Sequence, residues 1–206
     1  MKKYRCVKTN FVSQGYGIKN TAPSLLPLYN KYNLVAHNGI DYAVSCQDNS
    51  AKKGGLCESV YYDVDCAGEV VFIELNESFG LRIDIITESN GEIFKHRWCH
   101  FDSINPTLKV GDTIETGYLL GIAGNTGVST GAHVHTDIKK LEKDVYGNYY
   151  EKEPLNGYGG CCDPTPYLDN RFVLDVLDNL KAQIGVLQKM IEAYNKILEL
   201  FKIKVG

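Results

Sequence analysis

Two hydrophobic patterns divide the 206-residue chain. Between Leu34 and Ile138, short runs rich in β-branched and aromatic residues alternate with clusters of Asn, Gly and Ser, as at 70–75, 81–86 and 93–98. Runs of this length, bounded by turn residues, predict β-strands. Asn90-Gly91 separates two of the runs and is typical of a tight hairpin turn. The pattern therefore predicts a mainly β, mostly antiparallel body, with polar loops at 45–59 and 143–166.

The end of the chain has a helical period instead. Its apolar residues are spaced alternately by four and three positions: Val173, Leu177, Leu180, Ile184, Leu187, Ile191, Tyr194, Leu198 and Phe201. We call this heptad stripe the seam; it spans roughly 45 Å of helix. Val176, Met190 and Ile197 widen it, which favours a multi-helix assembly or packing onto another surface over a bare dimer. We therefore predict a β domain over residues 1–168 and, over 169–206, an amphipathic, coiled-coil-like helix for assembly or docking.

Charge and composition narrow the possible partners and locations. Lys and Arg number 22 against 25 Asp and Glu, a net charge of -3, which argues against nucleic acid as a partner. No stretch of 18 uncharged apolar residues occurs, so we expect no membrane span. The basic start, Met1 to Cys6, is not followed by an apolar stretch. We therefore expect no signal peptide and synthesis in the cytoplasm.

The seven cysteines are odd in number and include no CxxC pair. This argues against a full disulfide framework or a four-thiolate zinc site. Free, mostly buried thiols in a reducing compartment are the prediction. A single disulfide among Cys46, Cys57 and Cys66, which bracket one polar insertion, is the alternative that stays open.

Candidate chemistry gathers around the histidines. His133 and His135 are two residues apart in a predicted strand, so both rings face one side. The small residues before them, 124–132, allow a substrate backbone to approach closely. His37 and Asp41 also share a face in a strand, and Gly39 between them permits a kink. Two imidazoles and one carboxylate form a catalytic zinc set with an open position for water.

Four segments in this order resemble the lysostaphin/LytM-type zinc peptidases. That family reads HxGxD, an aromatic-x-His-Leu segment, VGxxVxxG and GxTGxSTGxHxH. The corresponding segments here are 37–41, 98–101, 110–117 and 124–135. The resemblance covers about residues 10–140 and implies the family's two-sheet antiparallel β groove, a duplicated hybrid motif-like fold. Phe101 replaces the usual Leu, and Thr136-Asp137 stands where Phe-Glu is common.

The resemblance also implies roles for individual residues. One Zn²⁺ would be bound by His37, Asp41 and His135, while His100 and His133 would flank the metal-bound water and act in catalysis. Which of these two is the general base stays open. Substrate-binding positions implied are Tyr32, Trp98, Asn125, Thr126 and Gly127. Tyr29 is an alternative to Tyr32, and ordinary packing explains either tyrosine equally well. His96 shares the predicted strand face of Trp98 and His100, so we expect it at the rim of the groove.

The function implied is zinc-dependent endopeptidase cleavage of bacterial peptidoglycan, in the cross-bridge or the stem peptide. Besides that substrate, the expected partners are further copies of the chain or a phage tail or virion protein, bound through the helix. Gln14-Gly15-Tyr16-Gly17 resembles the opening of phage-related members and favours a virion-associated or lysis enzyme acting at the cell wall. The alternative is a non-catalytic structural or regulatory protein that retains the peptidase fold, with the helix as its assembly element.

Overall fold

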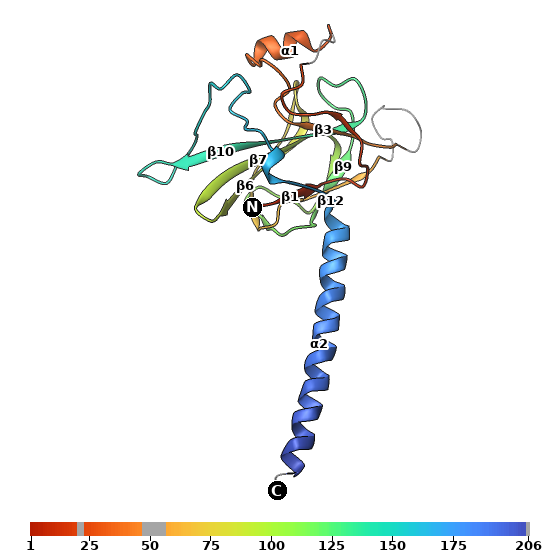
Figure 1. The fold of residues 1–206 in the computed structure, drawn as a ribbon. Helices are drawn as coiled ribbons and strands as arrows, with labels where there is room; N and C mark the ends of the chain where they lie inside the picture. The colour runs from red at the N-terminus through yellow and green to blue at the C-terminus, as the bar shows by residue number, and fades with distance from the viewer. Residues whose placement is uncertain (20–22, 47–56, 205–206) are drawn as a thin grey trace.

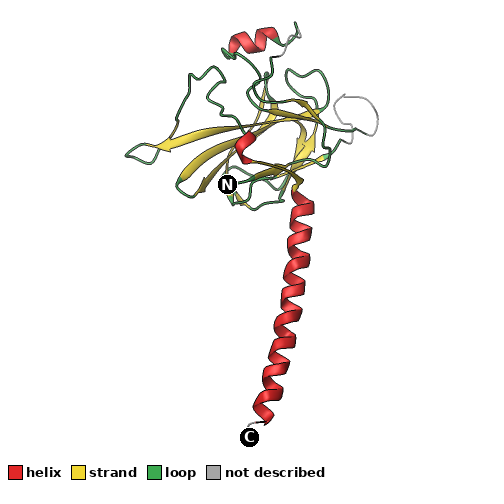
Figure 2. Cartoon of the chain, viewed as in Figure 1, coloured by secondary structure: helices red, strands yellow, loops and turns green. Residues whose placement is uncertain are grey.

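The computed structural model describes residues 1–19, 23–46 and 57–204 as a β body from which one long helix extends (Figures 1 and 2). The elements in chain order are β1 (Lys3–Arg5), β2 (Val12–Gln14), α1 (Leu26–Lys31), β3 (Ile40–Ala43), β4 (Ser59–Tyr61), β5 (Gly68–Asn76), β6 (Gly80–Ser89), β7 (Glu92–Ile104), β8 (Thr113–Ile114), β9 (Leu119–Ala123), β10 (His133–Lys143), β11 (Tyr149–Glu151), the 3-10 turn η1 (Thr165–Tyr167), β12 (Leu168–Phe172) and α2 (Val173–Lys204).

The main sheet is antiparallel and runs in the order β2-β3-β10-β7-β6-β5-β8. β9 pairs with β7 and with β4, and so continues the body beyond this path. The three runs expected to be strands lie in β5, β6 and β7. Asn90 and Gly91 have φ values of 53° and 79°, which the tight turn between β6 and β7 requires. The predicted mainly β, antiparallel fold is confirmed.

The hydrophobic core lies under β6, β7 and β9, and Trp98 is its largest fully buried side chain. Its ring meets Tyr62 edge-on at 5.8 Å between centroids, and the Lys3 ammonium lies 4.4 Å from the indole centroid. Lys3 is itself buried in an ion pair with Asp63 at 2.7 Å. The expected substrate-binding role of Trp98 is therefore wrong, because no surface of this ring is open to a ligand.

His96 is also fully buried, and its Nε2 lies 3.0 Å from the Thr87 hydroxyl. The expected place at the groove rim is wrong. The backbone gives the reason: His100 has a φ of 66°, and the pairing of β6 with β7 shifts register between Trp98 and Phe101. The alternation of side chains between the two faces of β7 is interrupted there, so His96 and Trp98 do not share a face with His100.

Both chain ends of the β body meet in a small second sheet, where β1 pairs in parallel with β12. β12 includes residues 169–172, so α2 begins four residues after the domain boundary expected from the sequence. The first turn of α2 packs on the body, with Val173 and Val176 buried against Tyr4 and Phe172. No helix that the structure describes is both long and apolar enough to cross a membrane.

Beyond its first turns, α2 carries the seam on an open face. Leu180, Ile184, Leu187, Ile191, Tyr194 and Leu198 are each between 41% and 60% exposed. The side chain of Phe201 lies outside the described residues. The predicted helix is thus present, and none of the residues that the structure describes covers the stripe from Leu180 to Leu198. Its pairing with other helices stays a prediction.

Cys46 and Cys57 form a disulfide across the polar insertion, while Cys6, Cys66, Cys99, Cys161 and Cys162 are free. The expectation of free thiols is therefore wrong for this pair. The alternative, a single disulfide among Cys46, Cys57 and Cys66, is correct, and Cys66 is the one left free. The insertion itself, 47–56, lies outside the described residues.

Candidate active site

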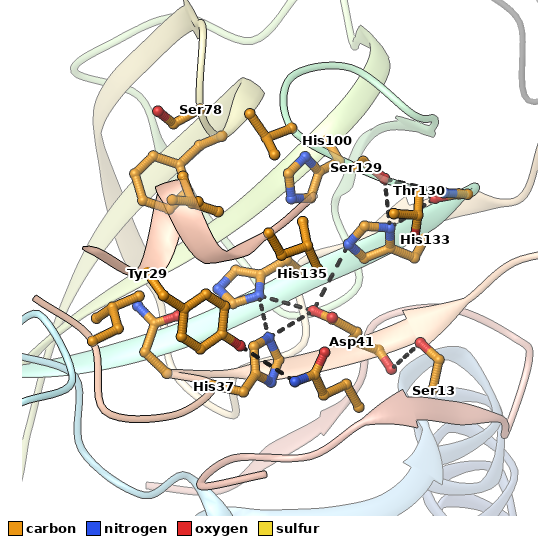
Figure 3. A pocket seen from close by; sticks show the side chains of 18 of the residues that line it. Ser13, Tyr29, His37, Asp41, Ser78, His100, Ser129, Thr130, His133 and His135 are labelled. Carbon is orange, nitrogen blue, oxygen red and sulfur yellow. Dashed lines mark hydrogen bonds and ion pairs between the residues drawn. The ribbon is translucent and has the colours of Figure 1, made fainter. Parts of the chain in front are cut away.

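A cavity of about 340 Å³ opens at the end of the body near α1, and four of the five histidines line it (Figure 3). Strand pairing assembles it. β10 pairs with β3 so that His135 lies opposite Asp41, and with β7 so that His135 lies opposite Cys99, next to His100. The neighbouring strands therefore gather residues that are about a hundred positions apart in sequence.

Three ligand atoms converge at the centre. His37 Nε2 lies 3.1 Å from His135 Nδ1 and 3.2 Å from Asp41 Oδ1, while His135 Nδ1 lies 2.8 Å from Asp41 Oδ1. In a tetrahedral zinc site with bonds of 2.0–2.1 Å, ligand atoms are about 3.3 Å apart. The triangle is close to that size, and its donor types are those zinc prefers, so these residues fit the metal.

Gly39 makes the triangle possible. A Cβ at this position would lie 2.5 Å from the Thr136 carbonyl oxygen and 2.7 Å from Cε1 of His135. A side chain here would therefore push β3 away from β10. This explains why a glycine stands between the two ligands of the HxGxD segment.

Backbone carbonyls fix the tautomers of three rings. His37 Nδ1 lies 3.1 Å from Gly15 O, His100 Nδ1 lies 2.7 Å from Thr126 O, and His133 Nδ1 lies 2.8 Å from Gly131 O. A carbonyl only accepts, so each Nδ1 carries the proton and each Nε2 presents a lone pair. Ser129 Oγ adds a contact of 3.1 Å to His133 Nδ1. The ring of His135 is reversed: its Nε2 lies 3.1 Å from Asp137 Oδ2, which leaves Nδ1 for the metal.

Electrostatics separate the roles further. Burial acts to raise the pKa of Asp41, but its close contacts with the His135 and His37 rings hold it well below its usual value. Burial acts to lower the pKa of His135, while hydrogen bonds with Asp137 and Asp41 raise it to about 9. Burial, together with His133 and His135, lowers the pKa of His100 to about 3. His100 is therefore a neutral imidazole at physiological pH.

Comparison with known proteins decides the family. The model of peptidase family M23 matches residues 35–148, more than half of the chain. The chain belongs to peptidase family M23. A search of curated protein sequences finds no match.

Among solved structures, Csd3 of Helicobacter pylori is similar with a TM-score of 0.51 and 17% identity, over 94% of this chain and 44% of that one. The catalytic domain of lysostaphin from Staphylococcus simulans has a TM-score of 0.49 and 19% identity, over 76% and 90%. A zinc-containing peptidase from Vibrio cholerae has a TM-score of 0.46 and 23% identity, over 68% and 35%. At such identities the likeness to Csd3 shows a common fold and nothing about activity.

The structure brings all five predicted metal and catalytic residues of this M23 chain into one cavity. The rings of His100 and His133 lie 4.6 Å apart between centroids, and His133 Nε2 is 3.8 Å from Asp41 Oδ1. Both rings stand beside the ligand triangle without belonging to it (Figure 3). Their roles in catalysis stay predictions.

The predicted substrate-binding residues are placed differently from one another. Tyr32 lines the cavity, with its hydroxyl 3.0 Å from Ser78 Oγ. Asn125, Thr126 and Gly127 are not among the residues that line it. Thr126 instead accepts a bond from Leu81 N–H at 2.9 Å and supports His100 through its carbonyl. Its position therefore favours a supporting role behind the groove wall over direct contact with substrate.

Sequence reasoning missed the role of Asp137, whose carboxylate lies behind His135. The signal was available, because His133, His135 and Asp137 alternate in a strand and so share one face. Tyr29, considered only as an alternative, lines the cavity with its hydroxyl 3.3 Å from Gln14 Nε2. The contact of the Gly15 carbonyl with His37 had no sequence signal, since a backbone oxygen carries no residue identity.

Proposed function

We propose that this M23 peptidase is a zinc-dependent endopeptidase that hydrolyses peptide bonds in bacterial peptidoglycan. The observation that carries the proposal is the triangle of His37, Asp41 and His135, with the imidazoles of His100 and His133 beside it in an open cavity. Family membership supports peptidase chemistry, and peptidoglycan is the substrate class that the sequence resemblance implies.

His37, Asp41 and His135 would hold the zinc. When bound, zinc supplies a Lewis acid that polarises the scissile carbonyl and lowers the pKa of water. The chain itself supplies proton transfer. His100 and His133 each present an unprotonated Nε2, so either can accept the proton of the attacking water and return it to the leaving amine. Tyr29 and Tyr32 both line the cavity, Tyr29 with its hydroxyl near Gln14 and Tyr32 with its hydroxyl near Ser78.

Purified peptidoglycan provides the test. We expect the zinc-loaded protein to release fragments with new amino termini inside the cross-bridge or the stem peptide, identified by mass spectrometry. Removing the metal with a chelator should abolish this release, and returning Zn²⁺ should restore it. A protein that binds zinc yet releases no fragment from several cross-bridge types would instead support the non-catalytic alternative.

For its place of action, we propose a virion-associated or lysis enzyme that reaches the cell wall as part of a larger assembly. The support is the open seam of α2, which would bind further copies of the chain or a phage tail protein. The resemblance of residues 14–17 to phage-related members points the same way.

A further inference from the structure

A buried ion pair lies directly behind the ligand triangle. Arg97 of β7 and Asp137 of β10 are cross-strand partners, with Arg97 Nε 2.7 Å and its terminal nitrogen 2.6 Å from Asp137 Oδ2. The same oxygen receives the Nε2–H of His135 at 3.1 Å. Asp137 is 1% exposed and Arg97 is 8% exposed. One carboxylate oxygen thus joins a fixed cation to a metal-ligand ring.

We propose that Asp137, clamped by Arg97, is the positioning residue that orients His135 for zinc. This inference rests on the proposed zinc-dependent function. The imidazole has two nitrogens, and only one can face the metal. By accepting the Nε2 proton, Asp137 fixes the ring orientation in which Nδ1 is the nitrogen turned toward Asp41 and His37. Nδ1 gives up its own proton when it binds the metal. The negative carboxylate also increases the basicity of the ring as a ligand.

Arg97 keeps Asp137 in place from the opposite side. Its guanidinium carbon also lies 4.3 Å from the Phe79 ring centroid, so packing restricts its movement as well. A carboxylate with only His135 as partner could rotate away from it. With two guanidinium nitrogens within 2.7 Å, the charged pair defines the position of Oδ2.

A residue outside the family match also contacts this network. Cys161 is fully buried, and its Sγ lies 3.9 Å from an Arg97 terminal nitrogen and 3.4 Å from Asn38 Nδ2. Asn156 Nδ2 donates a hydrogen bond to the Cys161 carbonyl oxygen at 2.8 Å, which holds Cys161 in place within its own segment. Cys161, a residue outside the family match, therefore packs against Arg97 and against Asn38, which follows the ligand His37.

Zinc affinity measures the proposal without any substrate. Competition with a chromophoric chelator is carried out on the full chain and on the Asp137→Ala, Asp137→Asn and Arg97→Lys variants. We expect both Asp137 variants to bind zinc about 10- to 100-fold more weakly. Arg97→Lys, which keeps the charge but loses the Nε donor, should weaken binding less. The visible absorption of the Co²⁺-substituted Asp137→Ala protein should also change, because the coordination of His135 changes.

Asp84→Asn is the matched control. Asp84 is buried on the neighbouring strand and is the cross-strand partner of Arg97, but its ion pair, at 3.5 Å, is with Arg82 and not with His135. We expect this variant to bind zinc as the unchanged chain does. Thermal unfolding of each metal-free variant shows whether it is folded. If Asp137→Ala does not fold, Asp137→Asn, which keeps the shape of the side chain, provides the measurement.

Two results would overturn the positioning role: zinc affinity within about twofold of the unchanged chain in a folded Asp137 variant, or an equal loss in Asp84→Asn. Zinc affinity is measured whether or not peptidoglycan is cleaved. Failure of the proposed enzymatic function would look different: the Asp137 variants would still bind zinc more weakly, but the zinc-loaded protein would release no peptide.

Discussion

At the scale of single residues, the five predicted metal and catalytic side chains fall into two groups: those whose removal should abolish zinc binding and those whose removal should lower only the rate. His37, Asp41 and His135 supply the atoms of the triangle, whereas His100 and His133 lie beside it. We expect His37→Ala, Asp41→Ala and His135→Ala to lose zinc and activity together. His100→Ala and His133→Ala should keep zinc and lose about 10²- to 10⁴-fold in rate, as expected for lost proton transfer.

Metal content after gel filtration, measured beside the rate of peptide release, separates the two groups. Full zinc occupancy in the Asp41→Ala protein would contradict the ligand assignment. Loss of zinc from both His100→Ala and His133→Ala would instead indicate that these two rings are metal ligands.

His96 links a buried residue to stability in acid. Burial and the nearby Lys3 lower its pKa well below the usual value, although Asp137 opposes this. Below pH of about 6.5 the unfolded chain takes up a proton that the folded chain does not. The free energy of unfolding therefore falls on acidification, by up to about 1.4 kcal/mol per pH unit. His100, whose pKa is lowered to about 3, acts in the same direction.

We expect His96→Gln, which keeps a hydrogen-bonding group near Thr87, to lose less stability between neutral pH and pH of about 4.5. Urea unfolding of chelated protein at several pH values measures this without metal release. An unchanged slope of unfolding free energy against pH would show that His96 is not the responsible group.

At the scale of elements, local sequence predicted what local physics determines. The β-branched runs, the Asn90-Gly91 turn and the helical seam are each specified by neighbouring residues, and all were found where expected. The expected positions of Trp98 and His96 at the groove are wrong because their burial depends on the irregularity at His100 and on distant segments that pack over β7. The clamp on Asp137 likewise joins β7 to β10, a pairing that no local pattern encodes.

The pairing of β3 with β10 gives a prediction at this scale. Gly39→Ala would bring a methyl group within 2.5 Å of the Thr136 carbonyl oxygen, so the two strands must separate or the His135 ring must turn. We expect weaker zinc binding and a loss of about 1–3 kcal/mol in unfolding free energy. Chelator competition and urea unfolding measure both.

Gly131→Ala is the control for this substitution, because a Cβ there meets nothing within 4 Å and the position has no positive φ. It should bind zinc as the unchanged chain does. If Gly39→Ala retained full affinity and stability, the close approach of β3 and β10 would not be what requires a glycine.

At the scale of the whole molecule, α2 extends from the end of the body opposite α1 (Figure 1). The cavity is lined in part by Leu28 and Tyr29 of α1 and so lies at the far end of the body from α2. Helices that associate along the seam would therefore leave the cavities open. Ile184 and Ile191 occupy one set of alternate seam positions, with Leu180 and Leu187 in the other. This arrangement keeps one apolar stripe against a neighbouring helix along its length.

The oligomeric state tests this arrangement. A chain ending after Asp178 keeps Val173 and Val176, which pack on Tyr4, and removes the exposed seam. We expect it to be monomeric, folded and able to bind zinc, whereas the full chain self-associates, as measured by light scattering during gel filtration. Ile191→Glu should also dissociate the full chain, because it buries a charge in the seam. Lys189→Glu, about 200° away around the helix, should not. A full-length monomer would show that the seam does not join copies of this chain, and would leave a tail or virion protein as the partner that covers it.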